Sequence, residues 1–230
     1  MYKKLAVLAS LAAGAVGSAH ALDAKFTGWA AGSSVSVTVA DNSNPLLTLA
    51  NGGSTMGVQA GGYNTTISNA GVLDGSFVSY CVDLGQYLKF NTDYNAGQYA
   101  AGSAETFFGS RYNDVLKLFS YGYNADTNGS AEKSAGFQIA LWELVYENSG
   151  SYNVYSDGIR FSNSAALDEA AGFLAGAALF NGQNLNLQVL TSGSNQDVAF
   201  ATPVPEPSVY ALMLVSLATV GVMTRRRKED

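Results

Sequence analysis

The chain has 230 residues, of which 12 are Lys or Arg and 18 are Asp or Glu, so its formal net charge is −6. Its one histidine, His20, lies in a segment that we expect to be removed, and its one cysteine is Cys81. These counts exclude an imidazole-based triad or metal site, an internal disulfide and a Cys-rich metal site. With 47% hydrophobic and 13% charged residues, the chain resembles neither a disordered acidic tail nor a nucleic-acid-binding protein. We expect no cofactor, no metal and no nucleic-acid partner.

Residues 1–21 have the pattern of a secretory signal peptide. A positively charged start at Lys3 and Lys4 precedes the apolar run 5–16, and a small-x-small motif ends at Ala21. The run is too short for an anchor helix, which needs about 20 apolar residues. The pattern predicts export and cleavage by signal peptidase after Ala21.

The end of the chain, residues 204–230, combines three features in a fixed order. A proline-rich motif comes first, and its prolines interrupt both helix and sheet: Val204, Pro205, Glu206 and Pro207. Residues 208–223 follow without a charge, and a basic cluster comes next: Arg225, Arg226, Arg227 and Lys228. An apolar run with a basic end predicts a single membrane segment whose basic end lies in the cytoplasm. Its 16 residues are few for a permanent span, which favours a temporary anchor.

This order of motif, apolar segment and basic cluster closely resembles the PEP-CTERM sorting signal. The resemblance implies a Gram-negative bacterium that produces exopolysaccharide. It also implies recognition by an exosortase, an intramembrane transpeptidase-like enzyme that removes the tail near Pro205, Glu206 and Pro207. The protein would be anchored transiently in the inner membrane and would then reach the cell surface or the extracellular matrix.

Residues 22–203 remain as one domain of 182 residues, long enough for a hydrophobic core of its own. This segment holds 15 acidic and six basic residues, a net charge of −9. Such a surface should repel nucleic acids and anionic membranes. Because the acidic residues are scattered, we interpret the charge as a source of solubility outside the cell.

The first half of this domain, residues 24–90, is rich in Thr, Val, Ser and Gly and alternates as strands do. We expect strands over Lys25–Ala30, Ser34–Ala40, Leu46–Ala50 and Ser76–Leu84. Glycine pairs predict turns at Asn51–Gly53 and Gly61–Gly62.

The second half changes to helical spacing and then returns to strands. We expect helices over Arg111–Tyr121, Ala131–Glu147 and Ser164–Phe180, with Asn163 as a cap and Asn181–Gly182 as a stop. Strands are expected over Leu185–Leu190 and Asp197–Ala201. This order predicts an α+β fold: a β-sandwich or barrel with an inserted helical subdomain.

Cys81 lies in a predicted strand whose alternation divides it into an apolar face and a mixed face. The apolar face holds Val78, Tyr80, Val82 and Leu84, and the mixed face holds Phe77, Ser79, Cys81 and Asp83. A lone cysteine is usually an inert buried hydrophobe. Here it shares a face with Ser79 and Asp83, and an unpaired cysteine in an exported protein calls for an explanation.

Gln138 lies near the middle of the apolar face of the predicted helix over 131–147, with Leu141, Trp142 and Val145 around it. A buried amide without partners costs about 1–3 kcal/mol. One solution is hydrogen bonding to a neighbouring strand backbone. The other is covalent: a cysteine thiolate attacks the Gln carbonyl, expels ammonia and forms an internal thioester. An amine or hydroxyl on a target surface can open that electrophile and become cross-linked.

Two short motifs, one in the strand and one in the helix, resemble those of the thioester domains of bacterial surface adhesins. They are Tyr80-Cys81-Val82-Asp83 and Gln138-Ile139-Ala140-Leu141-Trp142. The resemblance implies that Cys81 and Gln138 are the bond partners and that Tyr80, Asp83 and Trp142 support them. Residues 22–203 would then be a thioester-like extracellular domain between a signal peptide and a sorting tail.

Two other function classes remain open. A structural protein of an exopolysaccharide or biofilm matrix would keep Gln138 hydrogen-bonded and Cys81 as a free thiol, without covalent chemistry. A secreted hydrolase would need a carboxylate pair such as Glu143 and Glu147, but the helical wheel places these on a solvated polar face. We therefore do not expect an enzyme. Trp29 and the 13 tyrosines are able to stack on sugars, although their pattern fits core and sheet positions better.

Overall fold

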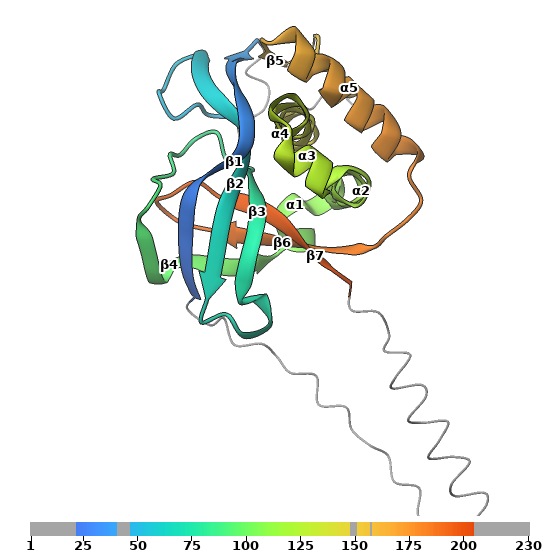
Figure 1. Cartoon of the computed structure of the whole chain (residues 1–230). Coiled ribbons are helices and arrows are strands. Elements are labelled where there is room, and N and C mark those ends of the chain that lie inside the picture. The colour runs from blue at the N-terminus through green and yellow to red at the C-terminus, as the bar shows by residue number, and fades with distance from the viewer. Residues whose placement is uncertain (1–21, 41–46, 148–150, 157, 205–230) are drawn as a thin grey trace, which may run out of the picture.

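The computed structural model describes residues 22–40, 47–147, 151–156 and 158–204 (Figure 1). The predicted signal peptide with Ala21, and the sorting tail from Pro205 onward, lie outside these residues. No helix within the described residues is long and apolar enough to cross a membrane. The predicted membrane segment, 208–223, also falls outside the described part of the chain.

The strands pair only in antiparallel fashion among the described residues, and their neighbour contacts form a ring. The order is β2-β3-β7-β6-β4-β1-β5. An additional pairing of β1 with β2 closes the ring, and β5 pairs with β1 outside it. In Figure 1, β1, β2 and β3 stand upright while β4, β6 and β7 run across them, which gives a sandwich-like arrangement. The strands are β1 Leu22–Val39, β2 Thr55–Ser68, β3 Gly75–Cys81, β4 Asp93–Ser103, β5 Ile159–Phe161, β6 Leu185–Thr191 and β7 Val198–Pro203.

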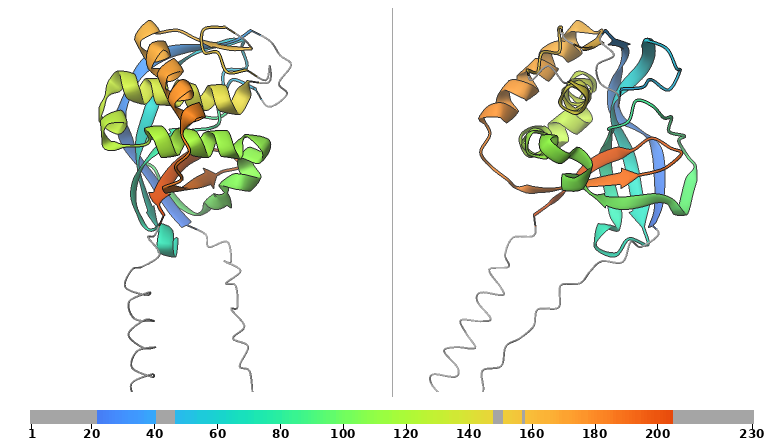
Figure 2. Two further views of the ribbon diagram at one scale, coloured as in Figure 1. Left: turned by 90° about the vertical axis from the view of Figure 1, so that its right-hand side faces the viewer. Right: turned by 180° about the vertical axis from the view of Figure 1, so that it is seen from behind.

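The α-helices of the described chain all fall between β4 and β6, and β5 lies between the last two. They are α1 Ala104–Phe108, α2 Tyr112–Gly122, α3 Ala125–Gly129, α4 Ala131–Tyr146 and α5 Ser164–Leu179, with short 3-10 turns at Gly71–Leu73 and Gly109–Arg111. Figure 2 shows the helices gathered on one side of the strands. The architecture is therefore α+β, as predicted, with the helices inserted between strands.

Helix α4 lies between the strands and α5, and it is buried along most of its length. The Ser130 side chain caps its start by accepting a hydrogen bond from the Lys133 N–H. Helix α5 begins at the predicted cap, where Asn163 accepts from the Ala166 N–H. The three long helices match their predicted ranges to within one residue at each end.

The predicted turn at Gly61–Gly62 is wrong, because both glycines lie inside β2. Gly61 pairs with Gly32 of β1, and its φ is +147°. A Cβ atom on Gly61 would lie 2.1 Å from the Ala31 carbonyl oxygen. The glycines therefore permit a close approach of two strands at an irregular point of their pairing.

Other strand boundaries also differ from the sequence prediction. The two strands predicted over 25–40 are one long strand, β1, and residues 47–50 form no strand. The turn at Asn51–Gly53 is present, since the Gly52 N–H donates to the Leu49 carbonyl. Strand β3 ends at Cys81 rather than at Leu84.

Candidate functional site

Cys81 is the last residue of β3, where that strand pairs with Val198 of β7. Helix α4 crosses this point and brings Gln138 against it. Cys81 is 0% exposed and Gln138 is 1% exposed. The two residues that the sequence singled out, 57 positions apart, therefore meet in the interior.

The Gln138 carboxamide binds the backbone of Cys81 through two hydrogen bonds. The Cys81 N–H donates to Gln138 Oε1 at 2.9 Å, and Gln138 Nε2 donates to the Cys81 carbonyl at 2.8 Å. The buried amide is thus satisfied by hydrogen bonds to a neighbouring strand backbone, the first of the two solutions considered from the sequence. The Cys81 thiol itself donates to the Asp83 carbonyl, with 3.1 Å between the sulfur and the oxygen.

A row of side chains at four-residue spacing along α4 holds the helix on this strand end: Ser134, Gln138, Trp142 and Tyr146. Ser134 Oγ accepts from the Gly62 N–H at 3.0 Å and donates to the Ala31 carbonyl at 3.0 Å. The Tyr146 hydroxyl accepts from the Leu84 N–H at 2.9 Å and donates to the Val82 carbonyl at 3.0 Å. Ser134 and Tyr146 were not predicted as site residues, although they lie four and eight residues from Gln138 and so share its face of the helix.

The thiol of Cys81 lies in an environment that opposes its ionisation. Burial raises its pKa to about 12, and the neighbouring Trp142 indole and Asp83 backbone offset this only in part. The carboxylates of Asp83 and Asp197 raise the thiol pKa further. At neutral pH the thiol is therefore protonated, and it is not a free nucleophile in this arrangement.

Two carboxylates come together beside the thiol, Asp83 after β3 and Asp197 before β7. Burial raises the pKa of Asp83, and burial together with the Asp83 charge raises the pKa of Asp197 to about 6. Each also accepts a backbone hydrogen bond, from Gly85 at 2.7 Å and from Ser192 at 2.6 Å respectively. Asp197 carries no sequence signal, because only the β3–β7 pairing brings it here.

Tyr80 and Trp142, two supporting residues named from the sequence, are both buried but serve different surroundings. The Tyr80 hydroxyl donates to Asn128 Oδ1 at 2.8 Å, and its ring packs on Phe137. Trp142 stacks on Phe161 and lies near the Cys81 sulfur. Its indole N–H makes no hydrogen bond of normal geometry among the described residues. Of the supporting residues, Trp142 and Asp83 therefore lie at the Cys81 sulfur, whereas the Tyr80 hydroxyl binds Asn128.

The solvated face predicted for Glu143 and Glu147 is wrong, because both side chains are buried. Glu143 Oε1 accepts from the Asn153 N–H at 2.7 Å, and Glu147 Oε2 accepts from the Gly158 N–H at 2.8 Å. The segment after α4 covers this side of the helix, which a wheel drawn from one helix does not show. The two carboxylates hold a loop in place.

The two faces predicted for β3, one apolar and one mixed, are not distinguished by exposure at the end of the strand. Ser79, Tyr80, Cys81 and Val82 are all buried, so both faces of the strand end are covered. Ser79 Oγ hydrogen-bonds Thr65 Oγ1 at 2.6 Å. No group of three or more His, Cys, Asp or Glu residues suited to a metal ion occurs among the described residues.

A protein-family model for the PEP-CTERM protein-sorting motif matches residues 203–228. No curated protein sequence matches the chain. Two solved structures are similar to it at low identity. The N-terminal domain of the Streptococcus pyogenes pilus tip adhesin Cpa is 14% identical, with a TM-score of 0.45 over 83% of this chain and 97% of that one. The N-terminal thioester domain of a Clostridium perfringens surface protein, in a cysteine-to-alanine mutant, is 15% identical, with a TM-score of 0.41 over 75% of this chain and 100% of that one.

The sorting motif predicted from Val204 to the basic cluster is therefore confirmed. The motif implies that the chain is exported and that an exosortase processes it.

Proposed function

We propose that Cys81 and Gln138 form an internal thioester, and that this bond attaches the exported protein covalently to a nucleophile on a surface. The observation that carries the proposal is the double hydrogen bond between the Gln138 amide and the Cys81 backbone. It holds a carboxamide beside the chain's one cysteine, at a position buried from water.

Thioester formation balances without a further reactant. The Cys81 sulfur attacks Cδ of Gln138, the Cδ–Nε2 bond breaks, and the nitrogen leaves as ammonia with the thiol proton. The Cys81 N–H donates to Oε1, the oxygen that gains negative charge during the attack, and such a donor stabilises the transition state. One backbone group thus both positions and polarises the carbonyl.

Capture of a target breaks the thioester at the same carbon, Cδ of Gln138. The nucleophile attacks Cδ, the C–S bond breaks, and the proton of the nucleophile passes to the sulfur. Burial of both partners favours survival of the thioester until then, because water is kept from the carbonyl. Each chain reacts once, so the protein acts as a covalent adhesin and not as an enzyme.

The intact mass of the exported protein, purified near neutral pH, tests the proposal. We expect a mass lower than the sequence mass by one ammonia, and methylamine should add to the protein and release a thiol. Cys81→Ala should show the full mass and no methylamine adduct. A freshly prepared wild type with full mass, whose thiol titrates after unfolding, would contradict the thioester.

A structural matrix protein without covalent chemistry is the second candidate. Two observations favour it: the hydrogen bonds to Cys81 already satisfy the Gln138 amide, and the thiol pKa of about 12 keeps the sulfur protonated. The same mass measurement separates the candidates, since this one requires the full mass and a free thiol. The Glu143–Glu147 pair does not favour a hydrolase, because these two carboxylates bind backbone N–H groups of a loop.

A further inference from the structure

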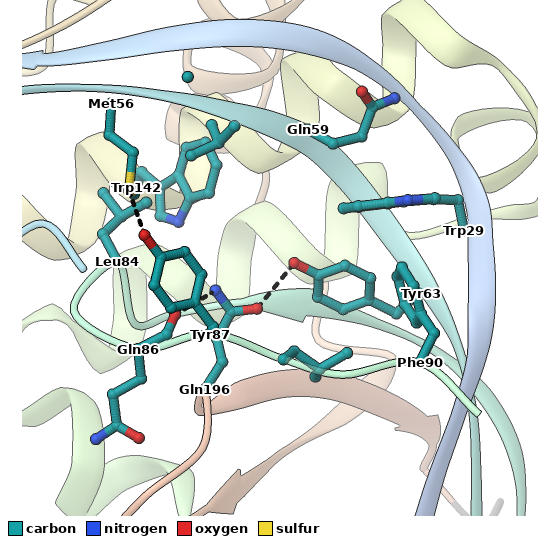
Figure 3. Close-up of a pocket in the computed structure, with 13 residues that line it drawn as sticks. Trp29, Met56, Gln59, Tyr63, Leu84, Gln86, Tyr87, Phe90, Trp142 and Gln196 are labelled. Atoms are coloured by element: carbon teal, nitrogen blue, oxygen red, sulfur yellow. Dashed lines mark hydrogen bonds between the residues drawn. The ribbon is translucent and has the colours of Figure 1, made fainter. Parts of the chain in front are cut away.

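A cavity of about 220 Å³ lies between β1, β2 and the segment that follows β3 (Figure 3). Its described lining contains no charged side chain. Aromatic rings and neutral amides make up much of it, among them Trp29, Tyr63, Phe90, Gln59 and Gln196. The cavity therefore suits an uncharged ligand with both apolar and hydrogen-bonding groups.

Three of the rings form one cluster at the side of the cavity. The ring centroids of Trp29 and Tyr63 are 4.7 Å apart, those of Trp29 and Phe90 5.3 Å, and those of Tyr63 and Phe90 5.8 Å. Trp29 is 37% exposed, so solvent reaches part of its indole. An exposed tryptophan supported by other rings is a rigid surface for stacking.

The inner part of the cavity ends at Trp142, which lines it and is 1% exposed. The Trp142 indole lies beside the Cys81 sulfur and lowers the pKa of that thiol.

The same end of the cavity adjoins the candidate thioester. Trp142 lines the cavity one helical turn after Gln138 in α4. Gln196 also lines it and donates to the Asp83 carbonyl at 3.1 Å, the same carbonyl that accepts from the Cys81 thiol. A ligand hydroxyl bound at this end of the cavity would therefore lie close to the Cys81–Gln138 pair.

We propose that this cavity binds one uncharged sugar ring and presents a hydroxyl of that ring to the Cys81–Gln138 thioester. The inference rests on the proposed function. The C–H face of a sugar stacks on aromatic rings, its hydroxyls bond to amides such as those of Gln59 and Gln196, and the ring carries no charge. A lysine ammonium would lose its hydration without gaining a carboxylate partner in the lining.

The size of the cavity and the chemistry of capture agree with this assignment. A volume of about 220 Å³ is below the usual range for ligand sites, about 300–1,000 Å³, so it suits one ring rather than a longer segment. The sugar oxygen attacks Gln138 Cδ, the C–S bond breaks, and the hydroxyl proton passes to the Cys81 sulfur. The products are an ester and a thiol.

Reversible binding is measured first, on the full chain carrying Cys81→Ala, so that it does not depend on the thioester. The chain's two tryptophans, Trp29 and Trp142, both line the cavity, so their fluorescence reports on it directly. We expect cellohexaose, laminarihexaose or maltohexaose to shift the emission at saturating concentration. A further Trp29→Ala change should weaken binding about tenfold, as lost stacking predicts.

Two further variants make this result specific. Tyr87→Ala removes an exposed ring of the cavity wall and should also weaken binding, without affecting the core. Phe107→Ala removes a ring that is as exposed as Trp29, at 37%, but lies on α1 outside the lining, and it should leave binding unchanged. No response to any of the three oligosaccharides, or equal weakening by Phe107→Ala, would overturn the proposal.

Capture is then measured by the intact mass of the wild type after incubation with the same oligosaccharides or with a lysine-containing peptide. A sugar adduct that Trp29→Ala reduces supports the proposal. A peptide adduct without a sugar adduct overturns it while leaving the thioester in place. A wild type of full mass, without the ammonia deficit, overturns the proposed function itself, so the two failures remain distinguishable.

Discussion

The Gln138 side chain binds the backbone of Cys81 and not the Cys81 sulfur. The Cys81 N–H donates to Gln138 Oε1 at 2.9 Å, and Gln138 Nε2 donates to the Cys81 carbonyl at 2.8 Å. Because both contacts are to the backbone, an alanine at position 81 can still make them. Loss of the thiol and loss of the amide should therefore have separable effects on stability.

The first prediction concerns this separation. In a Cys81→Ala background, where no thioester can form, Gln138→Ala should lower the free energy of unfolding by about 2–5 kcal/mol, because it leaves two buried backbone groups without partners. Cys81→Ala alone removes one sulfur atom and should cost about 1 kcal/mol relative to a chain without a thioester. Urea unfolding measures both. Equal stability of the single and double variants would contradict the role given to the amide.

A second prediction addresses Ser134, which links α4 to β1 and β2. Ser134→Ala leaves the buried Gly62 N–H and the Ala31 carbonyl without this hydroxyl, and should lower the free energy of unfolding by about 1–3 kcal/mol. Ser76→Ala, at an exposed serine paired with Thr66, should change it by less than about 0.5 kcal/mol. Thermal unfolding of the two variants compares them directly, and matching melting temperatures would argue against Ser134 as a docking residue.

The three long helices and the Cys81–Gln138 contact were predictable from the sequence because their signals are local. Helical periodicity predicted α2, α4 and α5, and the Asn163 cap marked the start of α5, whereas the five-residue helices α1 and α3 were not predicted. The same periodicity placed Gln138 on an apolar face, where a buried amide requires a partner. The chain's one cysteine, in a strand motif, was the available candidate for that partner.

The parts that were missed depend on contacts between distant segments. The local sequence at Gly61 predicts a turn, but this glycine permits the close approach of the paired strands β1 and β2. Glu143 reads as a solvated residue, but the chain beyond α4 folds back over it. Asp197 joins the site only through the pairing of β3 with β7. Strands β2 and β4 were not predicted because their mixed sequences lack clear alternation, and β5 was not predicted because it has only three residues.

A third prediction follows from the raised pKa of Asp197. Its folded-state pKa of about 6 exceeds the ordinary value of about 3.9, so between these values the folded protein binds more protons than the unfolded chain. The stabilising contribution of the protonated form is complete below about pH 4 and is lost as the pH rises through about 6.

Asp197→Asn removes this titration and keeps an oxygen acceptor for the Ser192 N–H. The fall in melting temperature between pH 4 and pH 6.5 should therefore be smaller in the variant than in the wild type. It should not vanish, because the pKa of Asp83 is also raised. Parallel curves for the two proteins would refute the assignment to Asp197.

A last prediction compares two glycines that both lie inside helices. Gly172 in α5 is exposed, and a Cβ atom there would meet no atom within 4 Å. Gly172→Ala should therefore raise the free energy of unfolding by about 0.5–1 kcal/mol, the usual gain in helix propensity. At Gly136 in α4, a Cβ atom would lie 2.5 Å from the Glu169 Cβ and 3.0 Å from the Ala166 carbonyl oxygen.

Gly136→Ala gains the same propensity but forces α4 and α5 apart, and overpacking of this kind costs about 1–3 kcal/mol. The net effect should be destabilising, opposite in sign to Gly172→Ala. Because α4 carries Gln138, the displacement should also reduce the fraction of chains with the ammonia deficit, which intact mass measures alongside urea unfolding. A stabilising Gly136→Ala would mean that the two helices are free to separate, and the close α4–α5 contact would then have no part in positioning Gln138.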